Sequence, residues 1–219
     1  MSDFGFYFTL GWEHIISTEA LDHILFIAAL AAIYMLRDWK RVILLVTAFT
    51  AGHTISLVLS VRDLVTAPSD WVEFLIPCTI LFTATSNLFL KSFTATAIRI
   101  NYLLALLFGL VHGLAFASVL KEILASDQDF VWSMFSFSTG LELGQVLVVG
   151  LVLLLAELFV SLLKVRRREW MIFISATVFG LALQMVVQRI PGRDSAYFKE
   201  NAPEKSALCN RLLAKQQYT

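Results

Sequence analysis

Charged residues are scarce in this 219-residue sequence, and so are prolines. Only 16% of the residues are charged, 58% are hydrophobic, and there are four prolines. Soluble domains carry about 25% charged residues, so the composition, with its mean hydropathy of +0.75, excludes an ordinary soluble domain. The formal net charge is zero, so no basic surface for nucleic acid is indicated.

Cysteine is also scarce. Cys78 lies within an apolar run and Cys209 lies in the polar C-terminal part, so the pair does not indicate a disulfide framework. Residues 1–14 contain no basic segment and no small-residue cleavage site. We therefore expect the N-terminus to be retained rather than removed as a signal peptide.

Runs of about twenty apolar residues recur along the chain, which is the length that a transmembrane helix needs. They predict an all-α polytopic integral membrane bundle of six or seven transmembrane helices, with spans near residues 19–36, 42–61, 71–90, 98–120, 130–162 and 170–189. The fifth run is long enough to be tilted or to project beyond the membrane. Residues 1–189 are expected to form one domain, with 1–18 as an interfacial or re-entrant segment, and residues 190–219 form a polar tail.

Basic residues in the short loops predict the orientation, because cytoplasmic loops carry an excess of Lys and Arg. The loops after the first, third and fifth spans contain nine of them: Arg37, Lys40, Arg41, Lys91, Arg99, Lys164, Arg166, Arg167 and Arg168. The alternate loops contain one each, Arg62 and Lys121. We therefore expect the N-terminus to lie outside.

All four histidines lie in or beside apolar runs, together with two acidic residues. These six candidate metal ligands are His14, Asp22, His23, His53, His112 and Glu142. With the predicted orientation they share one layer between the outer surface and the midplane. Ionisable groups inside a bilayer are costly and therefore indicate a functional site. Imidazole and carboxylate suit nickel, cobalt and zinc, so the pattern predicts a metal site that opens outward.

Other polar residues recur at helical spacing on the same spans and are expected to face the bundle interior. Those nearest the predicted site are Glu73, Thr50, Asn87 and Gln145, which we interpret as a supporting polar path. Asp22 either ligates the ion or orients an imidazole. The glycines that flank the ionisable groups either allow close helix packing or leave room for an ion.

Several strings closely resemble the HupE/UreJ family, in the order in which that family has them. They are His14-x7-Asp22-His23, Thr50-Ala51-Gly52-His53, Val72-Glu73-Phe74, Phe108-Gly109-Leu110-Val111-His112-Gly113 and Gly140-Leu141-Glu142-Leu143-Gly144-Gln145. The resemblance implies a bacterial inner-membrane protein that transports nickel or cobalt, with the six candidate ligands serving the metal. The branch that the sequence resembles most lacks a signal peptide and a His-rich loop.

Four kinds of function remain compatible with the residues. A transporter would pass a divalent metal ion between its helices, driven without nucleotide because the sequence has no nucleotide-binding motif. An intramembrane zinc hydrolase would use histidines and an acid to hold zinc and a water. An accessory protein would bind metal without moving it, and a haem carrier would use His53 and His112 as axial ligands. Membrane lipids, the metal ion and a second copy of the chain are the expected partners.

Overall fold

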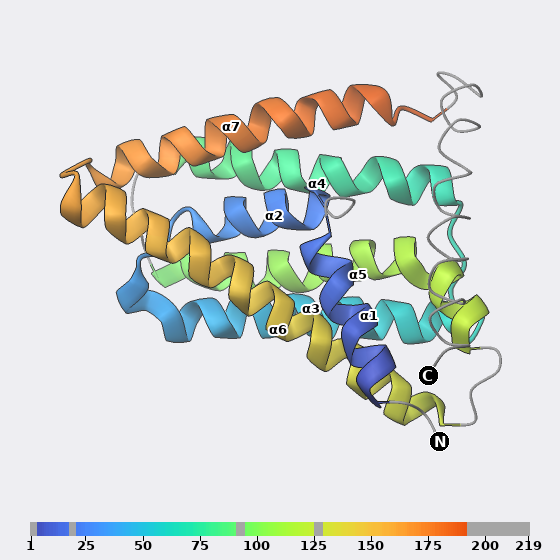
Figure 1. Ribbon diagram of the computed structural model, residues 1–219. Coiled ribbons are helices and arrows are strands. Elements are labelled where there is room, and N and C mark those ends of the chain that lie inside the picture. Colours follow the sequence, from blue (N-terminus) through green and yellow to red (C-terminus); the bar gives the residue numbers. More distant parts are fainter. Residues whose placement is uncertain (1–3, 18–20, 91–94, 125–128, 192–219) are drawn as a thin grey trace.

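The protein is a bundle of helices in the computed structural model, which describes residues 4–17, 21–90, 95–124 and 129–191 (Figure 1). The elements in chain order are α1 (Phe4–Ile16), α2 (Leu21–Ala31), the short turn η2 (Leu36–Asp38), α3 (Trp39–Val61), α4 (Ser69–Phe89), α5 (Ala95–Leu124), α6 (Phe130–Glu157), the π-helical turn η3 (Leu158–Leu162) and α7 (Arg167–Gln188). The described residues contain no strand, which confirms the all-α prediction.

Five helical segments are long and apolar enough to cross a membrane. They are Leu36–Val61, Ser69–Phe89, Arg99–Ile123, Phe130–Leu162 and Arg167–Gln188, and they correspond to the second to sixth predicted spans. The 33-residue segment formed by α6 and η3 is about 50 Å long at 1.5 Å per residue, whereas the hydrocarbon core is about 30 Å thick. It runs obliquely across the other helices (Figure 1), as its length predicted.

The first predicted span differs from the expectation. The continuous helix expected near 19–36 is an 11-residue helix, α2, which ends at Ala31 and is only about 16 Å long. Only α1 and α2 together reach the length of a span, with a bend of 70° between them. The chain therefore has up to six spans among its described residues, one of them broken.

Side chains from other helices explain why α2 ends where it does. The Asn87 Nδ2 atom donates to the Ala29 carbonyl at 2.7 Å, and the Arg167 guanidinium donates to the Ile33 carbonyl. The last carbonyls of a helix have no partner within the helix, and inside a membrane each must find one. These two contacts supply partners at the end of α2 and just beyond it.

Glycines let α1 pack directly onto α6. A Cβ atom on Gly11 would collide with the Phe137 carbonyl, and one on Gly140 would collide with the Phe8 carbonyl. Tyr7 and Ile15, one turn before and one turn after Gly11 on the same face of α1, are buried in the core. The N-terminal helix is therefore an integral part of the bundle, lying along α6 (Figure 1).

Glycines also let α3 and α5 pack closely together. This is the most extensive contact between two of the described helices. Cβ atoms on Gly52, Gly109 and Gly113 would strike the backbone of the facing helix at Leu106, Phe49 and His53 respectively. Backbone atoms of the partner helix thus occupy the space beside each glycine. Of the two roles considered for these glycines, close packing is the one that the structure shows, and it leaves no room for a porphyrin between α3 and α5.

The two ends of the bundle are named here by the predicted orientation. The predicted outer end is where α3, α5 and α7 end and where α1, α4 and α6 begin, and the predicted inner end is opposite (Figure 1). Most of the predicted polar tail, residues 192–219 with Cys209, lies outside the described residues.

Candidate metal centre

Three histidines from three helices meet inside the bundle. His14, His23 and His53 each offer a ring nitrogen, and these nitrogens lie within 4.8 Å of one another. Two imidazole nitrogens bound to one ion at about 2.0–2.1 Å can be at most about 4.2 Å apart. Three such nitrogens around one ion lie about 3.4–3.6 Å apart in tetrahedral or trigonal geometry, so shifts of up to about 1 Å per side chain would bring all three into a coordination sphere.

The break between α1 and α2 places two of these histidines. His14 lies in the last turn of α1, and His23 lies in the first turn of α2, where its side chain is buried. The sequence predicted for both a layer between the outer surface and the midplane. Because α1 forms the outer part of the broken span, the cluster lies inside the bundle, at a depth that His53 on α3 can reach.

His53 provides the clearest chemical sign of a ligand. Its side chain is 0% exposed, and neither of its ring nitrogens has a hydrogen-bond partner among the described residues. Buried polar atoms are almost always satisfied in proteins, and an exception requires an explanation such as an ion. An ion bound by the cluster would supply the missing partner.

His112 extends the cluster on the side of α5. Its Nδ1 atom lies 2.8 Å from the Phe108 carbonyl oxygen, and a carbonyl can only accept, so Nδ1 carries the proton. The Nε2 lone pair is then free, and that atom is buried without a partner among the described residues. The His112 ring lies 5.0 Å from the His23 ring between centroids. His112 is thus a fourth imidazole beside the three whose nitrogens lie within 4.8 Å of one another.

Asp22 orients His23 rather than joining the cluster itself. Its Oδ1 atom lies 3.1 Å from His23 Nδ1, so a carboxylate there receives the proton of Nδ1 and leaves the Nε2 lone pair available. That Nε2 atom is buried and has no partner among the described residues. A carboxylate on the second nitrogen of a ligating histidine is a common arrangement, because it fixes the tautomer and the ring orientation.

Arg189 is a site residue that the sequence analysis missed. Its Nη1 atom lies 3.6 Å from Asp22 Oδ2 and 3.5 Å from the Glu73 carbonyl oxygen. Pro77 lies four residues after Glu73 and has no N–H to bond that carbonyl. The proline inside an otherwise regular span was the available signal. Arg189 thus ties the end of α7 to both α2 and α4.

The structure does not bring Glu142 to the histidines. Its Oε1 atom accepts a hydrogen bond from the Thr47 hydroxyl at 2.5 Å, and Thr47 lies on an exposed part of α3. Glu142 thus faces Thr47 of α3 rather than the histidines.

The supporting polar residues mostly join helices. Thr50 donates to Gln145 Oε1 at 3.0 Å and so links α3 to α6. Asn87 holds the end of α2, and Glu73 offers its carbonyl to Arg189. We therefore assign Thr50, Gln145 and Asn87 to the packing around the cluster, to which Glu73 contributes its backbone carbonyl.

The donor set of the cluster is imidazole nitrogen throughout. Nitrogen ligands suit nickel, cobalt, copper and zinc, whereas magnesium and calcium prefer oxygen. The arrangement can therefore hold a divalent transition metal, and the identity of the metal is not fixed by it.

A family model agrees with the resemblance seen in the sequence. The model described as HupE / UreJ protein matches residues 1–189, which include every helix of the described structure. Comparisons with curated proteins and with solved structures gave no match. The chain belongs to the HupE/UreJ family.

Proposed function

We propose that this member of the HupE/UreJ family binds a divalent transition metal ion at His14, His23, His53 and His112 and carries it across the bacterial inner membrane. The observation that carries the proposal is the buried cluster of imidazoles with unpartnered nitrogens on three separate helices. Family membership fits a role related to metal transport, and nickel or cobalt are the ions that the resemblance implies.

The break in the first span adds an electrostatic argument for a cation. A helix carries partial negative charge at its C-terminal end, and broken transporter helices use such ends to hold cations. His14 lies in the last turn of α1, so that end faces the cluster. Asp22 in the first turn of α2 places a carboxylate where the positive end of that helix would otherwise repel the ion.

The surroundings of the cluster favour a binding and transport site over a hydrolase. A zinc hydrolase needs an acid or base beside a metal-bound water. Of the two acidic candidates, Asp22 is hydrogen-bonded to His23 Nδ1 and Glu142 is hydrogen-bonded to Thr47. Phenyl rings, among them Phe116 and Phe49, border the imidazoles on both sides, and they transfer no protons.

Binding is tested by the metal content of the detergent-purified protein after incubation with nickel, cobalt or zinc and removal of free ion. We expect about one ion per chain in the wild type, close to none in His53→Ala, and the wild-type amount in Thr177→Ala. Thr177 is a suitable control because it lies on an exposed face of α7 and bonds only within its helix. Equal metal content in wild type and His53→Ala would contradict the site.

Transport is tested separately in liposomes that contain a metal-sensitive dye. Wild-type protein should admit the ion that it binds, and His53→Ala should not. A protein that binds the ion stoichiometrically but admits none would be an accessory metal-binding protein, and the transport half of the proposal would then be wrong.

A further inference from the structure

A pair of phenyl rings borders the histidine cluster on the side of the predicted outer end. Phe116 of α5 and Phe137 of α6 stack with their centroids 5.6 Å apart and their planes inclined by 8°. The His14 ring lies 4.2 Å from Phe116, and the His53 ring lies 6.4 Å from Phe137. We call Phe116 and Phe137 the outer aromatic pair.

A second pair borders the cluster on the opposite side. The rings of Phe26 on α2 and Phe49 on α3 lie 5.1 Å apart, and both side chains are buried. The His112 ring lies 5.4 Å from Phe26 and 5.3 Å from Phe49. We call Phe26 and Phe49 the inner aromatic pair.

The direction of the helices places the two pairs on opposite sides of the imidazoles. Along α5, Phe116 follows His112 by four residues toward the predicted outer end. Along α3, which runs in the same direction, Phe49 precedes His53 by four residues. Four residues correspond to about 6 Å along a helix, so each pair lies about one helical turn from the histidines.

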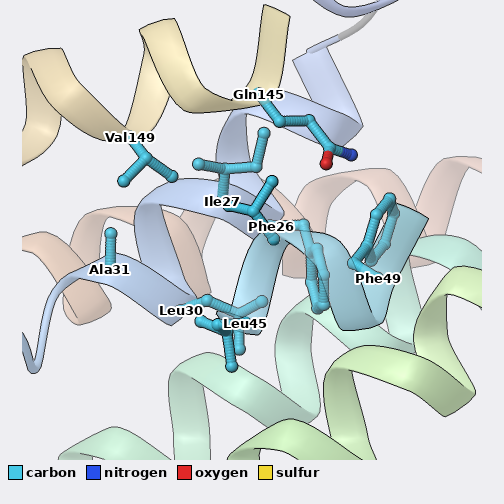
Figure 2. Close-up of a pocket in the computed structure, with 9 residues that line it drawn as sticks. Phe26, Ile27, Leu30, Ala31, Leu45, Phe49, Gln145 and Val149 are labelled. Atoms are coloured by element: carbon cyan, nitrogen blue, oxygen red, sulfur yellow. The ribbon is translucent and has the colours of Figure 1, made fainter. Parts of the chain in front are cut away.

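The inner pair separates the cluster from a recess between α2, α3 and α6. Figure 2 shows the recess, which is lined by Phe26, Ile27, Leu30, Ala31, Leu45, Val46, Phe49, Gln145 and Val149. Phe26 and Phe49 thus contact the histidines and the recess at once. Gln145 is the only polar side chain in this lining, and its Nε2 atom is buried without a partner among the described residues.

We propose that the two aromatic pairs are the gates of the transport path and that the structure shows the state in which both are closed. The proposal rests on the proposed function. A divalent ion cannot pass between phenyl rings in contact, because an apolar constriction excludes the water that the ion needs. Rotation of Phe137 opens the cluster toward the outer end, and rotation of Phe49 opens it toward the recess and Gln145.

Two closed gates in series make a specific prediction for single and double variants. Phe49→Ala and Phe137→Ala each remove one gate and leave the other in place. Each should speed release of bound zinc or nickel to excess EDTA in detergent at least tenfold, while the equilibrium affinity stays within about threefold. Phe173→Ala is the control, since Phe173 lies on α7 with 64% of its surface exposed, and it should leave the release rate unchanged.

Liposome flux then separates gating from general loosening of the core. The double variant Phe49→Ala/Phe137→Ala should leak the ion through an open path, at a rate far above the sum of the two single variants. If an alanine variant does not fold, Phe49→Leu and Phe137→Leu provide the same comparison with less volume lost. Release rates within twofold of wild type, or single variants that leak as much as the double, would overturn the proposal.

The two proposals fail in distinguishable ways. A wild-type protein that binds no zinc, nickel or cobalt contradicts the metal site itself, whatever the phenylalanine variants do. A wild-type protein that binds and admits the ion, with phenylalanine variants that release it at the wild-type rate, contradicts the gates alone.

Discussion

Two pairs of helices carry the histidines, and they are held in place by different forces. The α3–α5 pair, with His53 and His112, consists of long helices whose backbones touch at glycines. The α1–α2 pair, with His14 and His23, is a broken span. Its first half, α1, packs on α6 at glycines in the same way. Its second half, α2, is tied at one end to Arg189 and at the other to Asn87 and Arg167.

This difference indicates which helices of the site are fixed and which can move. Directly packed backbones have little freedom to move, because a close-packed interior transmits strain rather than absorbing it. Hydrogen bonds between side chains and neighbouring helices contribute about 0.6 kcal/mol each on average inside membranes and can exchange partners. We therefore expect α3, α5 and α1, whose backbones pack directly on neighbouring helices, to be the fixed part of the site. We expect α2, which side-chain contacts hold at both ends, to be the part that adjusts when the ion binds.

The largest expected effect comes from disturbing the fixed part. Gly109→Ala places a Cβ atom against the Phe49 carbonyl, so α3 and α5 must separate, at a cost of about 1–3 kcal/mol. We expect a clear fall in thermal stability and loss of metal binding, measured by a thermal melt in detergent and by metal content.

Gly150→Ala is the matched control, because nothing lies within 4 Å of a Cβ atom built on Gly150. It should melt at or above the wild-type temperature. Similar losses in both variants would mean that close packing at Gly109 does not support the site.

A moderate effect is expected from loosening α2. Asp22→Asn removes the charge that holds His23 Nδ1 and Arg189. Loss of such an orienting carboxylate typically lowers metal affinity 10–100-fold, and we expect a loss in that range by titration of the ion, with little change in the melting temperature.

Asp63→Asn is the control for Asp22→Asn, because it removes the same charge at a site away from the histidines. Asp63 pairs with Lys121 at 2.5 Å, and both side chains are largely exposed, so its removal should leave the affinity unchanged. An Asp22→Asn protein that binds metal as tightly as Asp63→Asn would show that Asp22 does not position His23.

The smallest expected effect is at the other end of α2. Asn87→Ala removes the bond to the Ala29 carbonyl and should cost about 0.6–1.7 kcal/mol of stability. Thr85→Ala on the same helix is the control, because Thr85 bonds only to the Leu81 carbonyl one turn earlier. Protease sensitivity near Ala31 that increases in the first variant and not in the second would locate the change at the end of α2.

The sequence predicted the long helices well because their apolar runs are bounded by charged or polar loops. It did not predict that α2 ends at Ala31, since the next residues, Ala32 to Met35, are apolar and nothing in them interrupts a helix. The end of α2 depends on Asn87 and Arg167, which are distant in sequence.

The site, like the fold, was predictable only in part, because contacts between residues distant in sequence complete it. Counting residues along each span gives the depth of a group in the membrane. By this depth His23 and His53 were expected to lie close together, and they do. Depth does not give the side of the helix that a residue faces, which is why Glu142 was expected in the cluster. Its contact with Thr47 follows from how α6 lies on α3.

X-ray absorption at the metal edge tests the central claim most directly. Wild-type protein loaded with zinc or nickel should show three or four imidazole nitrogens at about 2.0–2.1 Å, with the multiple scattering that imidazole rings produce, and this signal should be lost in His53→Ala. A first coordination shell made only of oxygen, from water or carboxylate, would contradict a metal centre at the histidine cluster.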